Sequence, residues 1–256
     1  MKYLLEYACI SSVGKCRINN QDNFSCAGIY LKMDHAGTNE PLYAQIDVQT
    51  PRLFGVFDGM GGEEHGEIAA FLASKKAGSL SAFSDMPADD LIRFCKDANE
   101  EICRYAAENQ IPAMGTTAAI LLFDGKRFFL CNIGDSKIFR YSENGLEQLS
   151  EDHLGAAFSG QKPPLSQNLG IPEDEMIIEP YLAHGAYRDG DLYLICSDGL
   201  TDMVTTEEIA ETAAGAPVEE ACMALLEKAL SHGGKDNVTI ILCRIERRRG
   251  WLFSRK

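Results

Sequence analysis

Short apolar runs bounded by Gly, Asp or Asn recur along the chain and predict β-strands. They are rich in Val, Ile, Phe and Leu, and they have the length of buried strands. Two of them flank Asp124-Gly125, a pair that suits the positive φ of a tight turn, so we expect these two strands to form an antiparallel hairpin. The predicted strands are 53–57, 117–123, 127–133, 191–196 and 238–243.

Three longer segments repeat their apolar residues at intervals of three and four, which predicts amphipathic helices. In one of them Leu91, Phe94 and Ile102 share the apolar face, opposite Asp89 and Lys96. Strands outnumber helices, and the helices are inserted between strand runs instead of alternating with them, so the pattern predicts an α+β fold with antiparallel sheets. The predicted helices are 65–83, 88–109 and roughly 206–231.

Two stretches, 31–51 and 152–172, show neither period and are expected to be irregular, and loops of that length are usually functional or mobile. The chain has 256 residues, of which 45% are hydrophobic, and these values fit one large domain. We expect that domain over 1–246 and a basic tail over 247–256. The tail is either a solvated end or a weak contact with an anionic membrane surface, through its arginines and Trp251.

The cellular setting follows from what the sequence does not contain. No run of eighteen apolar residues occurs, and the N-terminal segment does not resemble a secretory signal, so we expect a cytoplasmic protein without stable membrane insertion. The nine cysteines include no Cys-x-x-Cys pair and lie mostly in apolar runs, which indicates reduced core residues. The five histidines are scattered and predict no zinc site.

The net charge of −14 argues against nucleic acid as a partner, because a phosphate backbone is bound by clustered Lys and Arg. The same charge would repel a phosphorylated substrate. An acidic protein that acts on phosphate therefore needs local positive charge, either from a well-placed arginine or from bound metal.

Aspartates follow or precede several of the predicted strands. Asp58 and Asp198 each end an apolar run and are followed by Gly, and Asp22, Asp135 and Asp236 also lie beside Gly, Asn, Gln or Ser near strand ends. Each one alone is more typical of a turn or a helix cap. Carboxylates delivered together into one place repel each other unless a cation lies between them, so their joint position indicates a metal site. The other two Asp-Gly pairs, at 124–125 and 189–190, are interpreted as turns.

Six short strings, in order over residues 17–239, resemble those of the metal-dependent, type 2C serine/threonine protein phosphatases. One string would be weak support, but six in order are specific, and the Asp-Gly-Met-Gly-Gly form resembles the bacterial members. The strings are Arg17-x-x-Asn-Gln-Asp22, Phe57-Asp-Gly-Met-Gly-Gly62 with Gly66-Glu67, Gly115-Thr-Thr117, Ile133-Gly-Asp-Ser136, Cys196-Ser-Asp-Gly-Leu200 and Lys235-Asp-Asn-Val-Thr239.

The resemblance implies a central sandwich of two antiparallel β-sheets flanked by pairs of helices, with a binuclear Mn²⁺ or Mg²⁺ centre at one end. Asp58 matches the ligand that bridges the two metals, and the Gly59 carbonyl matches a ligand of the second. Asp198 and Asp236 match ligands of the first metal. All-oxygen ligands are the type that Mg²⁺ and Mn²⁺ prefer.

Three further matches complete the site that the resemblance implies. Asp22 matches an acidic position that acts mainly through metal-bound waters. Asp135, with Asp198, matches a third and weaker metal site of bacterial relatives, so two or three ions are expected. Arg17 matches the arginine that grips the substrate phosphate.

The activity implied is hydrolysis of phosphoserine or phosphothreonine by a metal-activated water, with no covalent phosphoenzyme and no catalytic cysteine. The expected partners are phosphorylated proteins and a serine/threonine kinase, and the protein is expected to be a monomer. Two alternatives stay open, namely a phosphatase of small phosphorylated metabolites and a non-catalytic phosphoprotein-binding regulator.

Three features depart from the family pattern. Many eukaryotic relatives have a histidine after the Asp-Gly where this chain has Met60, so no residue is assigned as the proton donor. His65 is interpreted as a helix cap or surface residue, and a metal-bound water is the preferred donor. The flap at 152–166 is shorter than usual and the stretch 31–51 is longer.

Overall fold

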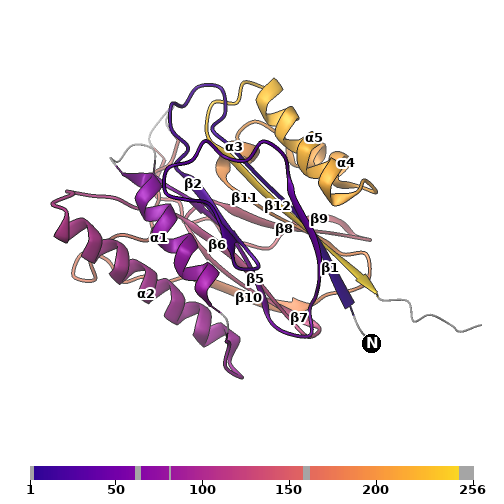
Figure 1. Ribbon diagram of the computed structural model, residues 1–256, viewed down its shortest axis with the longest axis horizontal. Coiled ribbons are helices and arrows are strands. Elements are labelled where there is room, and N and C mark those ends of the chain that lie inside the picture. The colour runs from indigo at the N-terminus through magenta and orange to yellow at the C-terminus, as the bar shows by residue number, and fades with distance from the viewer. Residues whose placement is uncertain (1–2, 61–64, 81, 158–161, 248–256) are drawn as a thin grey trace, which may run out of the picture.

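Two antiparallel sheets face each other at the centre of the computed structural model, which describes residues 3–60, 65–80, 82–157 and 162–247 (Figure 1). The first sheet has the strand order β4-β1-β12-β11-β8-β9. Its strands are β1 (Tyr3–Ser12), β4 (Leu42–Asp47), β8 (Lys137–Ser142), β9 (Gly145–Gln148), β11 (Leu192–Cys196) and β12 (Val238–Arg247).

The second sheet has the order β10-β7-β6-β5-β2-β3. Strands β6 and β7 form the predicted hairpin, in which Asp124 pairs with Arg127 across a two-residue turn and Gly125 has a φ of 62°. The strands are β2 (Asp22–Cys26), β3 (Ile29–Tyr30), β5 (Arg52–Asp58), β6 (Ala118–Asp124), β7 (Arg127–Ile133) and β10 (Tyr181–Ala186).

Helices cover the outer face of each sheet (Figure 1). Helices α1 (Gly66–Ser79) and α2 (Pro87–Glu108) pack on the second sheet through a cluster that includes Phe57, Phe94 and Ile120. Helices α4 (Thr206–Ala213) and α5 (Val218–Ser231) pack on the first sheet, and the one-turn helix α3 (Asp198–Thr201) follows β11. The predicted sandwich flanked by helix pairs is confirmed.

The core consists of three apolar layers, one between the sheets and one beneath each helix pair. The central layer contains large aromatic side chains, among them Phe54, Phe123 and Tyr193, which are fully buried and meet edge to face. Such contacts combine extensive apolar burial with favourable ring geometry. This rigid centre fixes where the strands end, and the strand ends carry the candidate site.

All five predicted strands and the first two predicted helices are confirmed, with small shifts of their ends. The single helix predicted at 206–231 is wrong, because the chain breaks at 214–217 into α4 and α5. Gly215 has a φ of 73°, and Pro217 precedes α5, so neither residue continues a helix. Thr205 begins α4 with a capping box to Glu208, so the predicted start of this segment is correct and only its continuity is not.

The expectation that all of 31–51 is irregular is also wrong, because β4 lies within it and extends the first sheet. Its residues alternate between half-buried and exposed positions, as an edge strand does, and contain few β-branched residues. The segment 152–172 contains no helix or strand in its described residues, as predicted.

In the described part of the chain, no helix is both long enough and apolar enough to cross a membrane. The nine cysteines are all free, and seven of them are buried. Arg247 ends β12, whereas 248–256 lie outside the described residues, so the basic tail stays a prediction.

Candidate metal centre

Strand ends from both sheets bring the predicted aspartates to one end of the sandwich. Asp58 ends β5, Asp198 follows β11, Asp135 lies between β7 and β8, and Asp236 lies two residues before β12. These four side chains, together with Gly59 and Arg17, line one cavity of about 420 Å³. The structure therefore gathers residues that are up to 219 positions apart in sequence, as in the contact between Arg17 and Asp236.

Two consecutive threonines fix the backbone that carries Asp58. The Asp58 amide donates to Thr117 Oγ1 at 3.0 Å, and the Asp58 carbonyl accepts from Thr117 N at 2.9 Å and from Thr116 Oγ1 at 3.0 Å. Thr117 Oγ1 also lies 2.7 Å from Ser136 Oγ, next to Asp135. The Gly-Thr-Thr and Gly-Asp-Ser strings thus hold two of the carboxylates in place.

Close backbone contact explains the glycine after Asp58. A Cβ on Gly59 would lie 2.4 Å from the Gly66 carbonyl oxygen and 2.5 Å from the Gln21 carbonyl oxygen, which no side chain tolerates. The Gly59 amide donates to that Gln21 carbonyl at 3.0 Å. Gly59 is therefore needed for the loop to pass between β2 and the start of α1.

Asn237 ties the segment that carries Arg17 to the start of β12. Its Nδ2 donates to the carbonyls of Val13 and Asn19 at 2.9 and 3.0 Å, and its Oδ1 accepts from Gln21 N at 2.8 Å. Arg17 Nη2 then donates to Asp236 Oδ2 at 2.6 Å. The hydrogen bonds of Asn237 thus bring Arg17 and Asp236 to the same rim of the cavity.

Asp22 lies behind the cavity and is only 1% exposed. It pairs with Asp58 across β2 and β5, and its Oδ2 accepts from Ser197 Oγ at 2.7 Å. Burial raises the pKa of Asp22 to about 7; the hydroxyls of Ser197 and Thr239 oppose this shift, and the charges of nearby aspartates add to it. Asp22 is therefore a buried carboxyl beneath the cavity wall whose charged form is disfavoured without a nearby cation.

The electrostatics of the cavity favour a bound cation. Burial is the main reason why the pKa of Asp58 lies well above its ordinary value, and the charges of Asp22 and Asp198 raise it further. The pKa of Asp135 is raised by burial and then by Asp198. A divalent cation would remove the repulsion that adds to both shifts and would offset the cost of burying the charged carboxylates.

The donor set fits ions that retain water. Within the described ranges, no group of three or more His, Cys, Asp or Glu side chains forms a set that could hold one ion by itself. The carboxylates are instead spread around the cavity, and their oxygens are hard ligands. Mg²⁺ and Mn²⁺ suit this arrangement, because they accept oxygen ligands and Mg²⁺ in particular keeps several waters beside one or two protein carboxylates.

Two charged residues that line the cavity, Lys162 and Asp202, were not predicted from the sequence. Lys162 Nζ lies 3.2 Å from Asp135 Oδ2 and 3.3 Å from Asp202 Oδ2, and it makes a still shorter contact with Asp198 Oδ2. The long irregular segment around Lys162 was a signal of function, but one lysine in a loop carries no pattern. Asp202 could have been found four residues after Asp198, one helical turn away.

His65, which the sequence predicted to be a helix cap or a surface residue, lies at the start of α1. His65 is the N-cap residue of α1 with a φ of 73°, and its side chain is 41% exposed. Met60, not a histidine, lines the cavity after Gly59. The described lining therefore offers no histidine as a proton donor.

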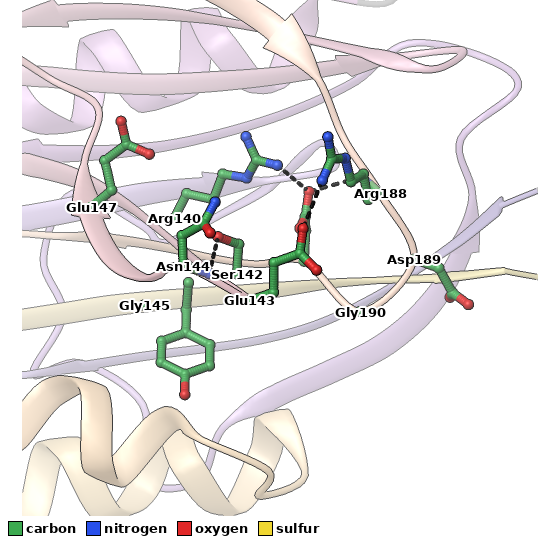
Figure 2. Close-up of a pocket in the computed structure, with 11 residues that line it drawn as sticks. Arg140, Ser142, Glu143, Asn144, Gly145, Glu147, Arg188, Asp189 and Gly190 are labelled. Atoms are coloured by element: carbon green, nitrogen blue, oxygen red, sulfur yellow. Dashed lines mark hydrogen bonds and ion pairs between the residues drawn. The ribbon is translucent and has the colours of Figure 1, made fainter.

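A larger cavity of about 820 Å³ lies at the opposite ends of β8 and β11, around Arg140 and Arg188 (Figure 2). Both arginines are paired: Arg140 Nη2 lies 2.9 Å from Asp191 Oδ2, and Arg188 Nη1 lies 2.9 Å from Glu143 Oε1. Glu147 adds further negative charge to the lining. Its carboxylates Glu143 and Asp191 are paired with these arginines, and none of its residues belongs to the predicted site, so the smaller cavity is the candidate site.

Comparisons with known proteins agree with this geometry. The model of the family described as protein phosphatase 2C matches residues 42–236. The serine/threonine protein phosphatase PstP of Mycobacterium tuberculosis is 32% identical over 255 residues, which are 93% of this chain and 45% of PstP, so the chain spans less than half of that relative. The serine/threonine phosphatase stp of Listeria monocytogenes is 27% identical over 251 residues, with 90% of this chain and 91% of stp covered.

A solved structure shows the same fold. The crystal structure of the catalytic domain of PstP, in complex with 2 manganese ions, matches with a TM-score of 0.75 at 28% identity. The match covers 96% of this chain and 100% of that domain.

The raised pKa of Asp22 predicts a pH-dependent stability in chelator-treated protein. Because its folded-state pKa of about 7 exceeds the usual 3.8, the contribution of Asp22 to stability is complete below pH 3.8 and is lost as the pH rises through about 7. The wild type should lose on the order of a few kcal/mol from this group between about pH 5 and about pH 8, and Asp22→Asn should lose less. Urea unfolding measures both, and equal losses would contradict the shift.

Proposed function

This chain belongs to the protein phosphatase 2C family, and from that premise we propose that its carboxylate cavity hydrolyses phosphoserine and phosphothreonine in proteins. The single observation that supports the proposal most is the meeting of Asp58, Asp198 and Asp236 with Arg17 in one cavity. This arrangement joins acidic groups that fit divalent cations with a cation that fits phosphate.

We propose two Mn²⁺ or Mg²⁺ ions as cofactors, the number of manganese ions in the PstP structure, with Asp135 available to a third. Asp58, the Gly59 carbonyl, Asp198 and Asp236 would hold the two ions, and Asp22 would act from beneath mainly through metal-bound waters. Ions bound there would supply an activated water and positive charge for the phosphate.

Arg17 would bind and orient the phosphate. Its side chain is 39% exposed at the cavity rim, and its guanidinium already contacts Asp236, so a phosphate oxygen can reach its remaining N–H groups. Its fixed positive charge also offsets the repulsion that a phosphorylated substrate meets at a protein of net charge −14.

Protein substrates are the proposed class because the relative PstP is named a serine/threonine protein phosphatase. A serine/threonine kinase is the partner that would supply such substrates. Comparing a phosphothreonine peptide with free phosphoserine would separate this proposal from a phosphatase of small metabolites.

We also propose that the protein works as a monomer in the cytoplasm. The nine free cysteines support a reducing compartment, because exposed and buried thiols alike persist there.

Metal dependence is the first test. Protein stripped with a chelator should hydrolyse a phosphothreonine peptide after addition of Mn²⁺ or Mg²⁺ and not with Ca²⁺ or without metal, because Ca²⁺ takes more oxygen ligands at longer distances than Mg²⁺ does. Phosphate release measures the activity. Folded protein that is inactive with every ion would favour the binding-regulator alternative.

Asp58→Asn should keep the fold and lower turnover at least ~10²-fold, the scale on which one major electrostatic contributor acts. Asp124→Asn is the matched control, because Asp124 also precedes a glycine at a strand end but lies in the hairpin turn, away from the cavity. Circular dichroism checks the fold of both variants. Near-normal turnover by Asp58→Asn would refute the assignment.

Arg17→Ala should raise the KM for the phosphopeptide by roughly 10- to 100-fold, the effect of losing a charge-assisted hydrogen bond. The effect on kcat should be smaller if Arg17 mainly binds the phosphate. Arg188→Ala, which removes an exposed arginine from the other cavity, is the control. An unchanged KM in Arg17→Ala would remove Arg17 from substrate binding.

A further inference from the structure

A lysine ammonium lies among the carboxylates on one side of the candidate metal centre. Lys162 Nζ contacts Asp135, Asp198 and Asp202, and its side chain is 48% exposed. These partners come from two places in the fold, the link between β7 and β8 and the two ends of α3. An ammonium is a compact point charge with three donors, so three carboxylates match its capacity.

The positive charges are distributed unevenly around the cavity. Arg17 is paired with Asp236 on one side and Lys162 with Asp135 and Asp198 on another. Asp58, by contrast, makes no ion pair with any residue of the described ranges. The side near Asp135 is therefore already compensated by the chain itself, whereas the carboxylate of Asp58 is not.

We propose that Lys162 is a tethered cation that competes with a divalent ion for the Asp135 and Asp198 carboxylates. The inference rests on the proposed function and adds to it a determinant of how many ions the centre holds. An ion that binds to Asp135 and Asp198 together must displace the ammonium, since both cations use the same carboxylate oxygens. Of the proposed ligands of the other two ions, only Asp198 contacts Lys162, whereas Asp58 and Asp236 do not, so the competition should weaken the ion at Asp135 and Asp198 most.

Displacement is sterically simple for this side chain. Lys162 lies in the irregular segment, outside every helix and strand, and about half of its side chain faces solvent. Its long stem can move the charge away without a change in the core. Asp202, which is 49% exposed, contacts Lys162 at the outer edge of the cavity and helps to hold the ammonium there.

The test is a titration of chelator-treated protein with Mn²⁺, followed by isothermal titration calorimetry and by counting bound ions after equilibrium dialysis. Lys162→Gln should bind its weakest Mn²⁺ ion at least ~10-fold more tightly than the wild type, which corresponds to about 1.4 kcal/mol. At equal free Mn²⁺ it should then hold more ions. Lys162→Arg keeps the charge and should resemble the wild type.

A second control separates competition from a general change in charge. Lys126→Gln removes the same charge from an exposed position in the β6–β7 turn, far from the cavity, and should leave Mn²⁺ binding unchanged. An equal gain in Lys126→Gln would overturn the inference, as would unchanged Mn²⁺ binding in Lys162→Gln.

The remaining outcomes are also decisive. Lys162→Gln that binds Mn²⁺ like the wild type but binds inorganic phosphate more weakly would assign Lys162 to the substrate and overturn the competition. Failure of every variant and of the wild type to bind Mn²⁺ would overturn the metal centre itself, and the inference with it. If only the inference about Lys162 is wrong, the wild type will still bind Mn²⁺ and hydrolyse the phosphopeptide.

Discussion

Electrostatic repulsion among five aspartates is the constraint on which the site depends. Asp22, Asp58, Asp135, Asp198 and Asp236 come together at one end of the sandwich, where strand pairing holds Asp22 beside Asp58 and hydrogen bonds with Ser197 and Thr117 fix this pair. The pKa values of the buried members are raised mainly by burial, and repulsion from the neighbouring aspartates adds to the shift. The fold holds these charges together because the apolar layers between and outside the sheets fix the strand ends.

The polar residues around the aspartates serve this purpose. Thr116 and Thr117 hold the backbone of Asp58, Ser197 donates to Asp22, and Asn237 joins the segment of Arg17 to β12. All of these side chains are buried and hydrogen-bonded, as buried polar groups must be. The short strings of the sequence therefore contain both the proposed metal ligands and residues that hold them in position.

The sequence predicted most of this site because its signals are local. An apolar run that ends in Asp-Gly marks both a strand end and a carboxylate, so Asp58 and Asp198 could be found without a structure. The sequence did not predict β4, because an edge strand with one exposed face has a weak pattern. It also did not predict the break between α4 and α5, because the apolar period continues across Gly215. Lys162 was missed for another reason: its partners are 27, 36 and 40 residues away, and no local pattern connects them.

The cations of the cavity have unequal roles, which follow from their chemistry. Arg17 cannot lose its proton and offers a planar set of donors, so it suits a phosphate that arrives and leaves while its own charge stays constant. Lys162 carries a point charge on a flexible stem and is surrounded by carboxylates, so it can stand in for an ion but offers no fixed geometry for a transferring group. In a protein of net charge −14, Arg17 would thus supply the positive charge that binds the substrate phosphate, and Lys162 would set the ion content of the site.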